Sequence, residues 1–272
     1  MTPLAAGLDY FDLHFAGHRG FIATGLVHGT AGVGLVDPGP ATTLPAIRAA
    51  LTERGFTTAD IRWILLTHIH LDHAGGTGLL LKECPQARVL VHERGVRHLV
   101  DPSKLIASAT ILYAERMQEL WGDILPVPEA NIDVLGATGR AVVAGYDVDI
   151  AYTPLTAPPE TDLDAWRHST DTILGWNPDT LFLTHCGPQR APRLHFQEMW
   201  KQMDDWSAKV RASLALEGDD AAKAAAFHRT EIERLSQVLP RAEADLWALG
   251  ARFDLSWLGL ARYWRKKAAA TS

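Results

Sequence analysis

The stretch LLTHIHLDHAGG, residues 65–76, constrains the fold most, because it places three histidines and one aspartate within six positions, directly after an apolar run. His68 and His70 stand two positions apart, so in an extended segment both imidazoles point to the same side. Asp72 and His73 are adjacent and diverge unless the chain turns, which the following glycines permit. A polar loop with chance histidines is the alternative. The spacing favours two neighbouring metal ions, one bound by His68 and His70, the other by Asp72 and His73.

Two more polar residues follow apolar runs elsewhere in the chain. His185, in LFLTHCGP, repeats the Thr-His ending of the first cluster. Loops at strand ends are where ligands gather, so we expect His185 to be a metal ligand rather than a packed histidine. Asp37, in GLVDPGP, is either a turn residue or a residue that orients a ligand histidine. Histidine and carboxylate donors together favour zinc, with iron and manganese as alternatives.

Strand and helix patterns mix along the whole chain. Short apolar runs separated by glycine predict strands in the first part. Helical spacing is seen over residues 42–55, 104–121 and 163–176, and again almost continuously from residue 193. This mixture predicts an α/β or α+β fold in which helices cover sheets. We expect a first domain over residues 1–190 and a C-terminal helical extension, residues 191–272, packed on it.

Charge and hydropathy restrict the partners. The net charge is -6, which does not favour a nucleic acid partner. The N-terminal residues lack a basic segment followed by an apolar one, so we expect no signal peptide and no membrane span. Two cysteines define no disulfide framework, and the expected location is the cytoplasm.

Three segments together resemble the metallo-β-lactamase superfamily: LVDPG at 35–39, THIHLDHAG at 67–75 and LTHCGP at 183–188. The resemblance implies a four-layer αββα sandwich with the site at one edge. It implies that His68 and His70 bind a first ion, that Asp72, His73 and His185 bind a second, and that Asp37 supports them. It also implies hydrolysis by a metal-activated water, with Asp72 orienting the nucleophile or moving a proton. An ester, thioester or lactone of small size is the expected substrate.

The chain departs from that family after its strand VDIAYTP, residues 148–154. The family carries a Gly-His turn there and later a Gly-Asp turn, and neither occurs between Pro154 and His185. Five of the usual seven protein ligands remain. A lost segment would leave the second sheet short of strands, with an exposed edge that invites a second copy of the chain.

Two alternatives to a lost segment stay open. In one, side chains from elsewhere in the chain replace the missing ligands; the candidates are His92, Glu160, Asp162, Asp164 and His168. In the other, the chain keeps the fold and acts as a non-catalytic binding protein. An oxygen-reducing di-iron protein of the same fold is a further interpretation, but such proteins normally carry a flavin domain, and no phosphate-binding glycine motif occurs here. We expect at most one tightly held ion per chain.

Overall fold

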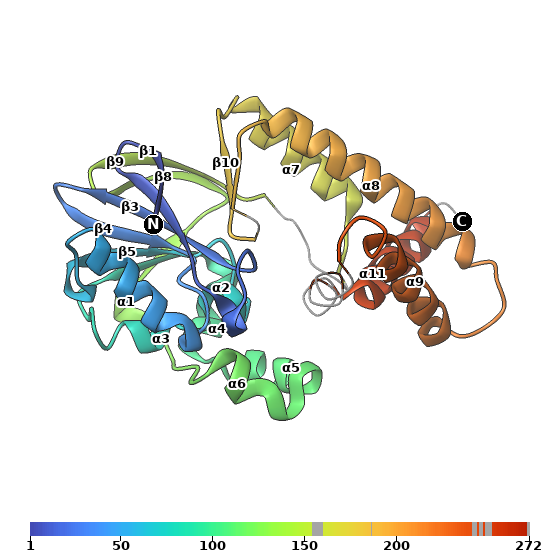
Figure 1. Ribbon diagram of the computed structural model, residues 1–272, viewed down its shortest axis with the longest axis horizontal. Coiled ribbons are helices and arrows are strands. Elements are labelled where there is room, and N and C mark those ends of the chain that lie inside the picture. Colours follow the sequence, from blue (N-terminus) through green and yellow to red (C-terminus); the bar gives the residue numbers. More distant parts are fainter. Residues whose placement is uncertain (154–159, 186, 241–243, 245–246, 248–251, 271–272) are drawn as a thin grey trace. The chain divides into compact units, whose positions relative to one another are not determined.

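The computed structural model describes residues 1–153, 160–185, 187–240, 244, 247 and 252–270 (Figure 1). The chain divides into two compact units, Met1–Tyr152 with Leu181–Gln189 and Thr153–Thr180 with Arg190–Ser272. This division assigns the helix over residues 163–175 to the second unit, whereas the predicted boundary at residue 190 would leave it in the first domain. That boundary, and the packing of the extension on the first domain, stay predictions.

One seven-stranded sheet organises the first unit. Its strands lie in sequence order: β1 (Thr2–Ala5), β2 (Leu8–Asp12), β3 (Ala23–Gly29), β4 (Gly32–Val36), β5 (Ile61–Leu65), β6 (Arg88–His92) and β7 (Ile132–Leu135). The strands from β1 to β4 pair antiparallel, and those from β4 to β7 pair parallel. Because parallel strands end at the same edge, the residues that follow β4, β5 and β6 lie together, where ligands bind in open α/β sheets.

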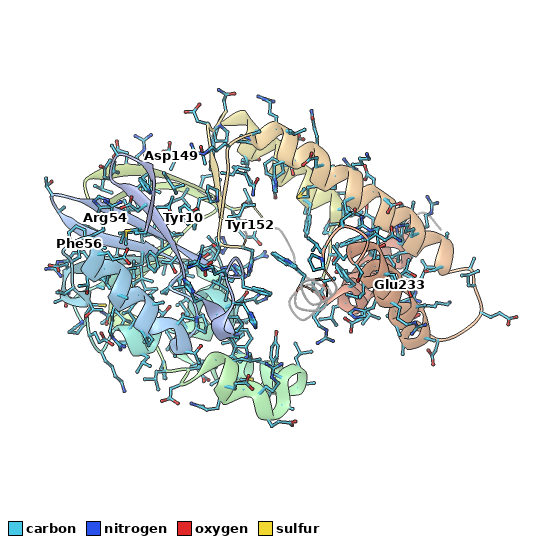
Figure 2. The ribbon with its side chains drawn as sticks, in the orientation of Figure 1. Tyr10, Arg54, Phe56, Asp149, Tyr152 and Glu233 are labelled. Atoms are coloured by element: carbon cyan, nitrogen blue, oxygen red, sulfur yellow. The ribbon has the colours of Figure 1, made fainter. Side chains whose placement is uncertain are left out.

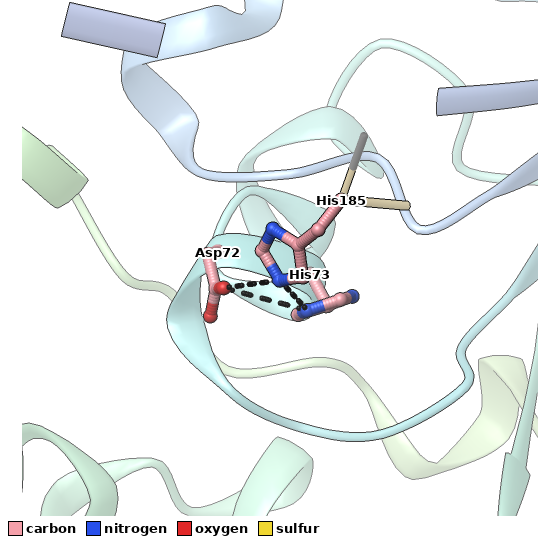
Figure 3. Close-up of side chains that lie close together, drawn as sticks. All are labelled: Asp72, His73 and His185. Atoms are coloured by element: carbon pink, nitrogen blue, oxygen red, sulfur yellow. Dashed lines mark hydrogen bonds and ion pairs between the residues drawn. The ribbon is translucent and has the colours of Figure 1, made fainter. Parts of the chain in front are cut away.

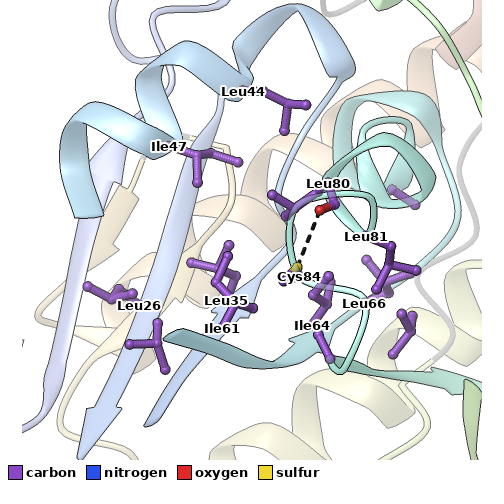
Figure 4. Close-up of a cluster of buried hydrophobic side chains, with 14 of the residues drawn as sticks. Leu26, Leu35, Leu44, Ile47, Ile61, Ile64, Leu66, Leu80, Leu81 and Cys84 are labelled. Carbon is purple, nitrogen blue, oxygen red and sulfur yellow. Dashed lines mark hydrogen bonds between the residues drawn. The ribbon is translucent and has the colours of Figure 1, made fainter. Parts of the chain in front are cut away.

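Helices cover one face of this sheet, including α1 (Leu44–Glu53) and α3 (Thr77–Leu80) (Figure 1). Leu44, Ile47 and Leu51 recur at helical spacing and are buried, which gives α1 one apolar face. They pack over fully buried sheet residues such as Leu35 and Ile64 (Figure 4). Each such side chain contributes about 1.5–3 kcal/mol through burial, so this cluster holds the site-bearing strands in place.

Two hairpins lie against the other face of the sheet. They are β8 (Thr138–Val143) with β9 (Tyr146–Ala151), and β10 (Leu181–Leu183) with β11 (Gly187–Gln189). A Cβ atom on Gly34 would lie 2.6 Å from Val143 Cγ1, so the first hairpin approaches the sheet backbone closely. The backbone N–H of Ala23 donates to the carbonyl of Thr184 at 2.7 Å and ties the second hairpin to β3. Helix, sheet and hairpin layers confirm the predicted mixed α/β class.

Helices dominate the described part of the second unit. They are α7 (Leu163–Gly175), α8 (Pro192–Ser213), α9 (Asp220–Leu235) and α11 (Phe253–Ala270). The helix predicted over residues 163–176 and the helical C-terminal part are therefore confirmed. Trp200 of α8 donates its indole N–H to Thr170 of α7 at 3.1 Å, and the Arg167 guanidinium lies 4.1 Å from the Trp200 ring centre. These contacts explain why α7 groups with the C-terminal helices.

The single helix predicted over residues 104–121 is wrong. The structure has α5 (Ser103–Tyr113) and α6 (Met117–Trp121), separated at Ala114, whose φ is 45°. The Trp121 ring of α6 stacks on the Phe15 ring, with ring centres 5.3 Å apart. Among the described residues, no helix combines the length and apolar character that crossing a bilayer requires.

Candidate metal centre

Asp37, directly after β4, is the buried acceptor around which the site is built. It is 0% exposed and has φ 51°, a left-handed conformation that is uncommon outside glycine. Its carboxylate accepts hydrogen bonds from the Thr67 N–H at 2.8 Å, the Thr67 hydroxyl at 2.7 Å and the Thr184 hydroxyl at 2.8 Å. A fourth contact, 2.8 Å long, joins it to His73 Nδ1. Asp37 therefore ties together the ends of β5 and β10 and the short helix α2 (Leu71–Ala74).

These contacts fix which nitrogen of each neutral imidazole carries its proton. His73 Nδ1 must donate to Asp37. His185 Nδ1 lies 2.8 Å from the Phe21 carbonyl, which can only accept, so this nitrogen also donates. The Thr67 hydroxyl gives its proton to Asp37, so His68 Nδ1 donates to Thr67 Oγ1 at 3.1 Å. In all three neutral rings Nε2 is therefore left with a lone pair.

Three acceptor atoms meet at the centre of the site (Figure 3). His73 Nε2 lies 3.1 Å from His185 Nε2, and Asp72 Oδ2 lies 3.4 Å from the former and 3.3 Å from the latter. Among the described residues, Asp72, His73 and His185 form the one group of three whose ligand atoms all lie within 4.8 Å of one another. Two imidazole nitrogens and a carboxylate oxygen match the three protein ligands of a catalytic zinc site, so the donor set fits a divalent ion.

The electrostatics of the site favour a cation in the same place. Burial alone would lower the pKa of His73, but its hydrogen bonds to Asp37 and Asp72 outweigh burial and raise it to about 9. The hydrogen bond to Asp72 raises the pKa of His185. Burial disfavours the ionised form of Asp72, yet its hydrogen bonds to His185 and His73 hold its pKa well below the usual value. The acceptors thus attract positive charge, which a metal ion supplies.

His68 and His70, the predicted ligands of a first ion, lie beside this group but outside it. The His68 ring centre is 3.9 Å from that of His73 and 4.6 Å from that of His70. Burial, together with positive charge at His73 and His70, lowers the pKa of His68 to about 3. His70 is exposed. The structure brings all five predicted ligands together, while their roles at the metal stay predictions.

The candidates for replacing the missing ligands have other contacts. Asp162 caps α7 by accepting from the backbone N–H of Asp164 and Ala165. Glu160 pairs with Arg262, and Asp164 pairs with Lys267 at 3.0 Å. His168 is an exposed residue of α7.

His92 Nδ1 accepts the backbone N–H of Arg94 at 3.3 Å. It therefore caps the helix that follows β6 instead of offering this nitrogen to an ion. Residues 154–159, where the family places its Gly-His turn, lie outside the described residues.

Thr67 and Thr184 are site residues that the sequence analysis did not single out as functional. Each directly precedes a predicted ligand, His68 or His185, and each donates its hydroxyl to Asp37. The repeated Thr-His pair in LLTHIH and LFLTHC is the available signal. In the sequence, the Thr-His pair indicates only where a strand ends, so it does not predict the hydrogen bonds that the two hydroxyls make.

Comparisons with known proteins identify the family to which this fold belongs. A profile of the metallo-beta-lactamase superfamily matches residues 18–188. No curated protein matches the sequence. A metallo-beta-lactamase family protein from Thermus thermophilus is 19% identical with a TM-score of 0.67, over 98% of this chain and 96% of its own.

Two further solved structures have the same fold. An archaeal metallo-beta-lactamase superfamily protein from Sulfolobus tokodaii is 19% identical with a TM-score of 0.59, over 72% of this chain and 86% of its own. The FEZ-1 metallo-beta-lactamase from Legionella gormanii is 17% identical with a TM-score of 0.52, over 75% and 84%. The predicted resemblance and fold class are confirmed. The chain belongs to the metallo-beta-lactamase superfamily, which includes hydrolases and generally binds divalent metal ions.

Proposed function

We propose that this chain is a hydrolase that uses one divalent ion, zinc by donor preference, to cleave a small ester, thioester or lactone. The observation that carries the proposal is the convergence of three acceptor atoms, one each from Asp72, His73 and His185. Hydrogen bonds to Asp37 and to the Phe21 carbonyl fix the tautomers of the two imidazoles. Iron and manganese remain alternatives for the same donors. When bound, such an ion lowers the pKa of water to about 7 and polarises the carbonyl under attack.

The chain's own residues have separate tasks in this reaction. His73 has a side chain that is 5% exposed, and Asp37 holds it, so it is the fixed element of the site. The side chains of Asp72 and His185 are 25% and 53% exposed, so the substrate approaches from their side. Asp72 Oδ2 faces both imidazoles, and its other oxygen orients the attacking water by accepting a hydrogen bond.

Ester, thioester and lactone hydrolysis tests the proposal. The protein is treated with a chelator, reloaded with zinc and assayed with p-nitrophenyl acetate, an acyl thioester and a γ-lactone. Zinc should restore a rate in the wild type and in His168→Ala, an exposed-histidine control, and not in His73→Ala. If no substrate is cleaved, or if His73→Ala keeps the wild-type rate, the proposal is wrong.

A non-catalytic binding protein is the second candidate. It is favoured by the absence of Gly-His and Gly-Asp pairs between Pro154 and His185 and by the position of His68 and His70 outside the three-residue group. Retained zinc without any hydrolysis would support it. We also propose a cytoplasmic location, a small-molecule ligand without nucleic acid or membrane partners, and pairing with a second copy of the chain.

A further inference from the structure

A second polar cluster lies at the ends of β6 and β9. The His92 ring stacks on the Tyr152 ring, with centres 4.4 Å apart and planes inclined by 24°. Arg94 Nη1 donates to the Tyr152 hydroxyl oxygen at 3.1 Å, and the Arg94 guanidinium carbon lies 5.5 Å from the Tyr152 ring centre. Tyr152 is 38% exposed at the end of β9 (Figure 2), and Arg94 is exposed. The cluster is thus held in shape and open to solvent.

The cluster presents hydrogen-bond donors. His92 Nδ1 accepts the backbone N–H of Arg94, so in the neutral ring Nε2 carries the proton. The Tyr152 oxygen accepts from Arg94, which leaves the hydroxyl proton to be donated elsewhere. No carboxylate pairs with Arg94 in the described part of the chain, whereas Arg88, at the other end of β6, pairs with Asp133. His92, Arg94 and Tyr152 therefore offer three hydrogen-bond donors, and the positive charge of Arg94 is not neutralised by a carboxylate of the described residues.

This cluster adjoins the candidate metal centre. β5 and β6 are parallel neighbours whose pairing ends with Leu65 opposite Leu90, so Thr67 and His92 each lie two residues beyond that pair, at the same edge of the sheet. Ile69, between the two histidines of the first pair, packs on Gly95: a Cβ atom there would lie 2.8 Å from Ile69 Cγ2. The carboxyl edge of the sheet thus carries an acceptor-rich site and, beside it, a donor-rich one.

We propose that His92, Arg94 and Tyr152 bind a carboxylate carried by the substrate, while the scissile carbonyl is held at the metal centre. The substrate class is then an ester, thioester or lactone that also bears a carboxylate. This inference rests on the proposed function for the identity of the reaction, and on the cluster alone for binding of the anion. Arginine suits the role because its planar guanidinium matches a carboxylate and stays charged.

Anion binding is tested without metal or turnover. The metal-free protein, labelled with ¹⁵N, is titrated with sodium glutarate while the arginine Nε–H signals are followed. We expect a saturable shift of the Arg94 signal that is lost in Arg94→Gln and kept in Arg97→Gln, a neighbouring exposed control. No saturable shift, or the same shift with sodium chloride at equal ionic strength, would overturn the anion site.

Substrate choice is tested on the zinc-loaded protein. The readout is the ratio of kcat/KM for mono-p-nitrophenyl glutarate to that for p-nitrophenyl acetate. Loss of a charged hydrogen bond should lower this ratio about 10- to 100-fold in Arg94→Gln and about 3- to 10-fold in Tyr152→Phe. Arg97→Gln should not change it. If the cluster only clamps β9 to β6, both esters slow equally and the ratio stays constant, which overturns the inference. Absence of hydrolysis of either ester refutes the proposed function instead, and the NMR titration still decides on the anion site.

Discussion

Replacing Asp37 by Asn should both destabilise the metal-free protein and weaken its binding of zinc. The carboxylate accepts from four donors, and an amide of the same shape must turn its NH₂ group toward at least one of them. The single amide oxygen cannot accept from both the Thr67 backbone N–H and the His73 Nδ1–H unless another of the four hydrogen bonds is lost. Breaking one partner of a buried ion pair costs about 3–5 kcal/mol.

The pH dependence of this loss follows from the raised pKa of His73. Its pKa in the folded protein is about 9 against a usual value of 6.5. A raised pKa means that protonated His73 stabilises the folded state fully below pH 6.5, and that this contribution disappears as the pH rises through 9. The shift corresponds to roughly 3 kcal/mol. The destabilisation caused by Asp37→Asn should therefore be larger at pH 6.5 than at pH 10.

Urea denaturation of the metal-free variants at both pH values measures this effect, and chelator competition measures zinc affinity. We expect zinc affinity to fall about 10- to 100-fold, as for other residues that orient a ligand histidine. Asp133→Asn, which removes a half-exposed pair with Arg88, is the control and should change the free energy of unfolding only slightly, because water screens such pairs. Equal losses at pH 6.5 and pH 10, or unchanged zinc affinity, would refute the reasoning.

Three further predictions concern the proton at the site, the threonine contacts and the core. Zinc binding at pH 7.5 should release at least about one proton per ion, because the ion displaces the proton of His73 and that part of the His185 rings whose raised pKa keeps them protonated; calorimetry in buffers of different ionisation enthalpy measures this, and no release would contradict the raised pKa of His73. Thr184→Val should weaken zinc binding about 3- to 10-fold through loss of one hydrogen bond to Asp37, and Thr184→Ser should restore it; equal binding by the valine variant would remove the role of the hydroxyl. Leu35→Ala, at a fully buried position, should lower the free energy of unfolding by about 2–5 kcal/mol in urea titrations, and a loss below about 1 kcal/mol would show that the core is not closed there.

Local sequence patterns predicted the helices whose formation depends on residues close together in the sequence. The helical spacing over residues 42–55 predicted α1, and that over residues 163–176 predicted α7. The break at Ala114 was not predictable, because no glycine or proline stands there to mark it. The helix after the break, α6, makes a contact of Trp121 with Phe15, which is distant in the sequence. The grouping of α7 with α8 also depends on tertiary contacts, those of Trp200 with Thr170 and Arg167.

At the metal centre, too, local patterns were predictable and contacts between distant residues were not. The residue types and the spacing of His73 and Asp72 indicated a metal, and they lie in one short helix. The hydroxyl of Thr184 reaches Asp37 across 147 positions of sequence, and no local pattern reveals such a contact. The cluster of His92, Arg94 and Tyr152 forms for the same reason, since β6 and β9 belong to different layers of the first unit.

The number of zinc ions retained per chain tests the central claim most directly. The wild type and His185→Ala are loaded with excess zinc, dialysed and analysed for metal and protein content. A site made by Asp72, His73 and His185, beside a His68 and His70 pair that lacks further described ligands, predicts one ion per wild-type chain and a strong loss in His185→Ala. Two ions retained per wild-type chain, or one ion retained by His185→Ala, would contradict the account.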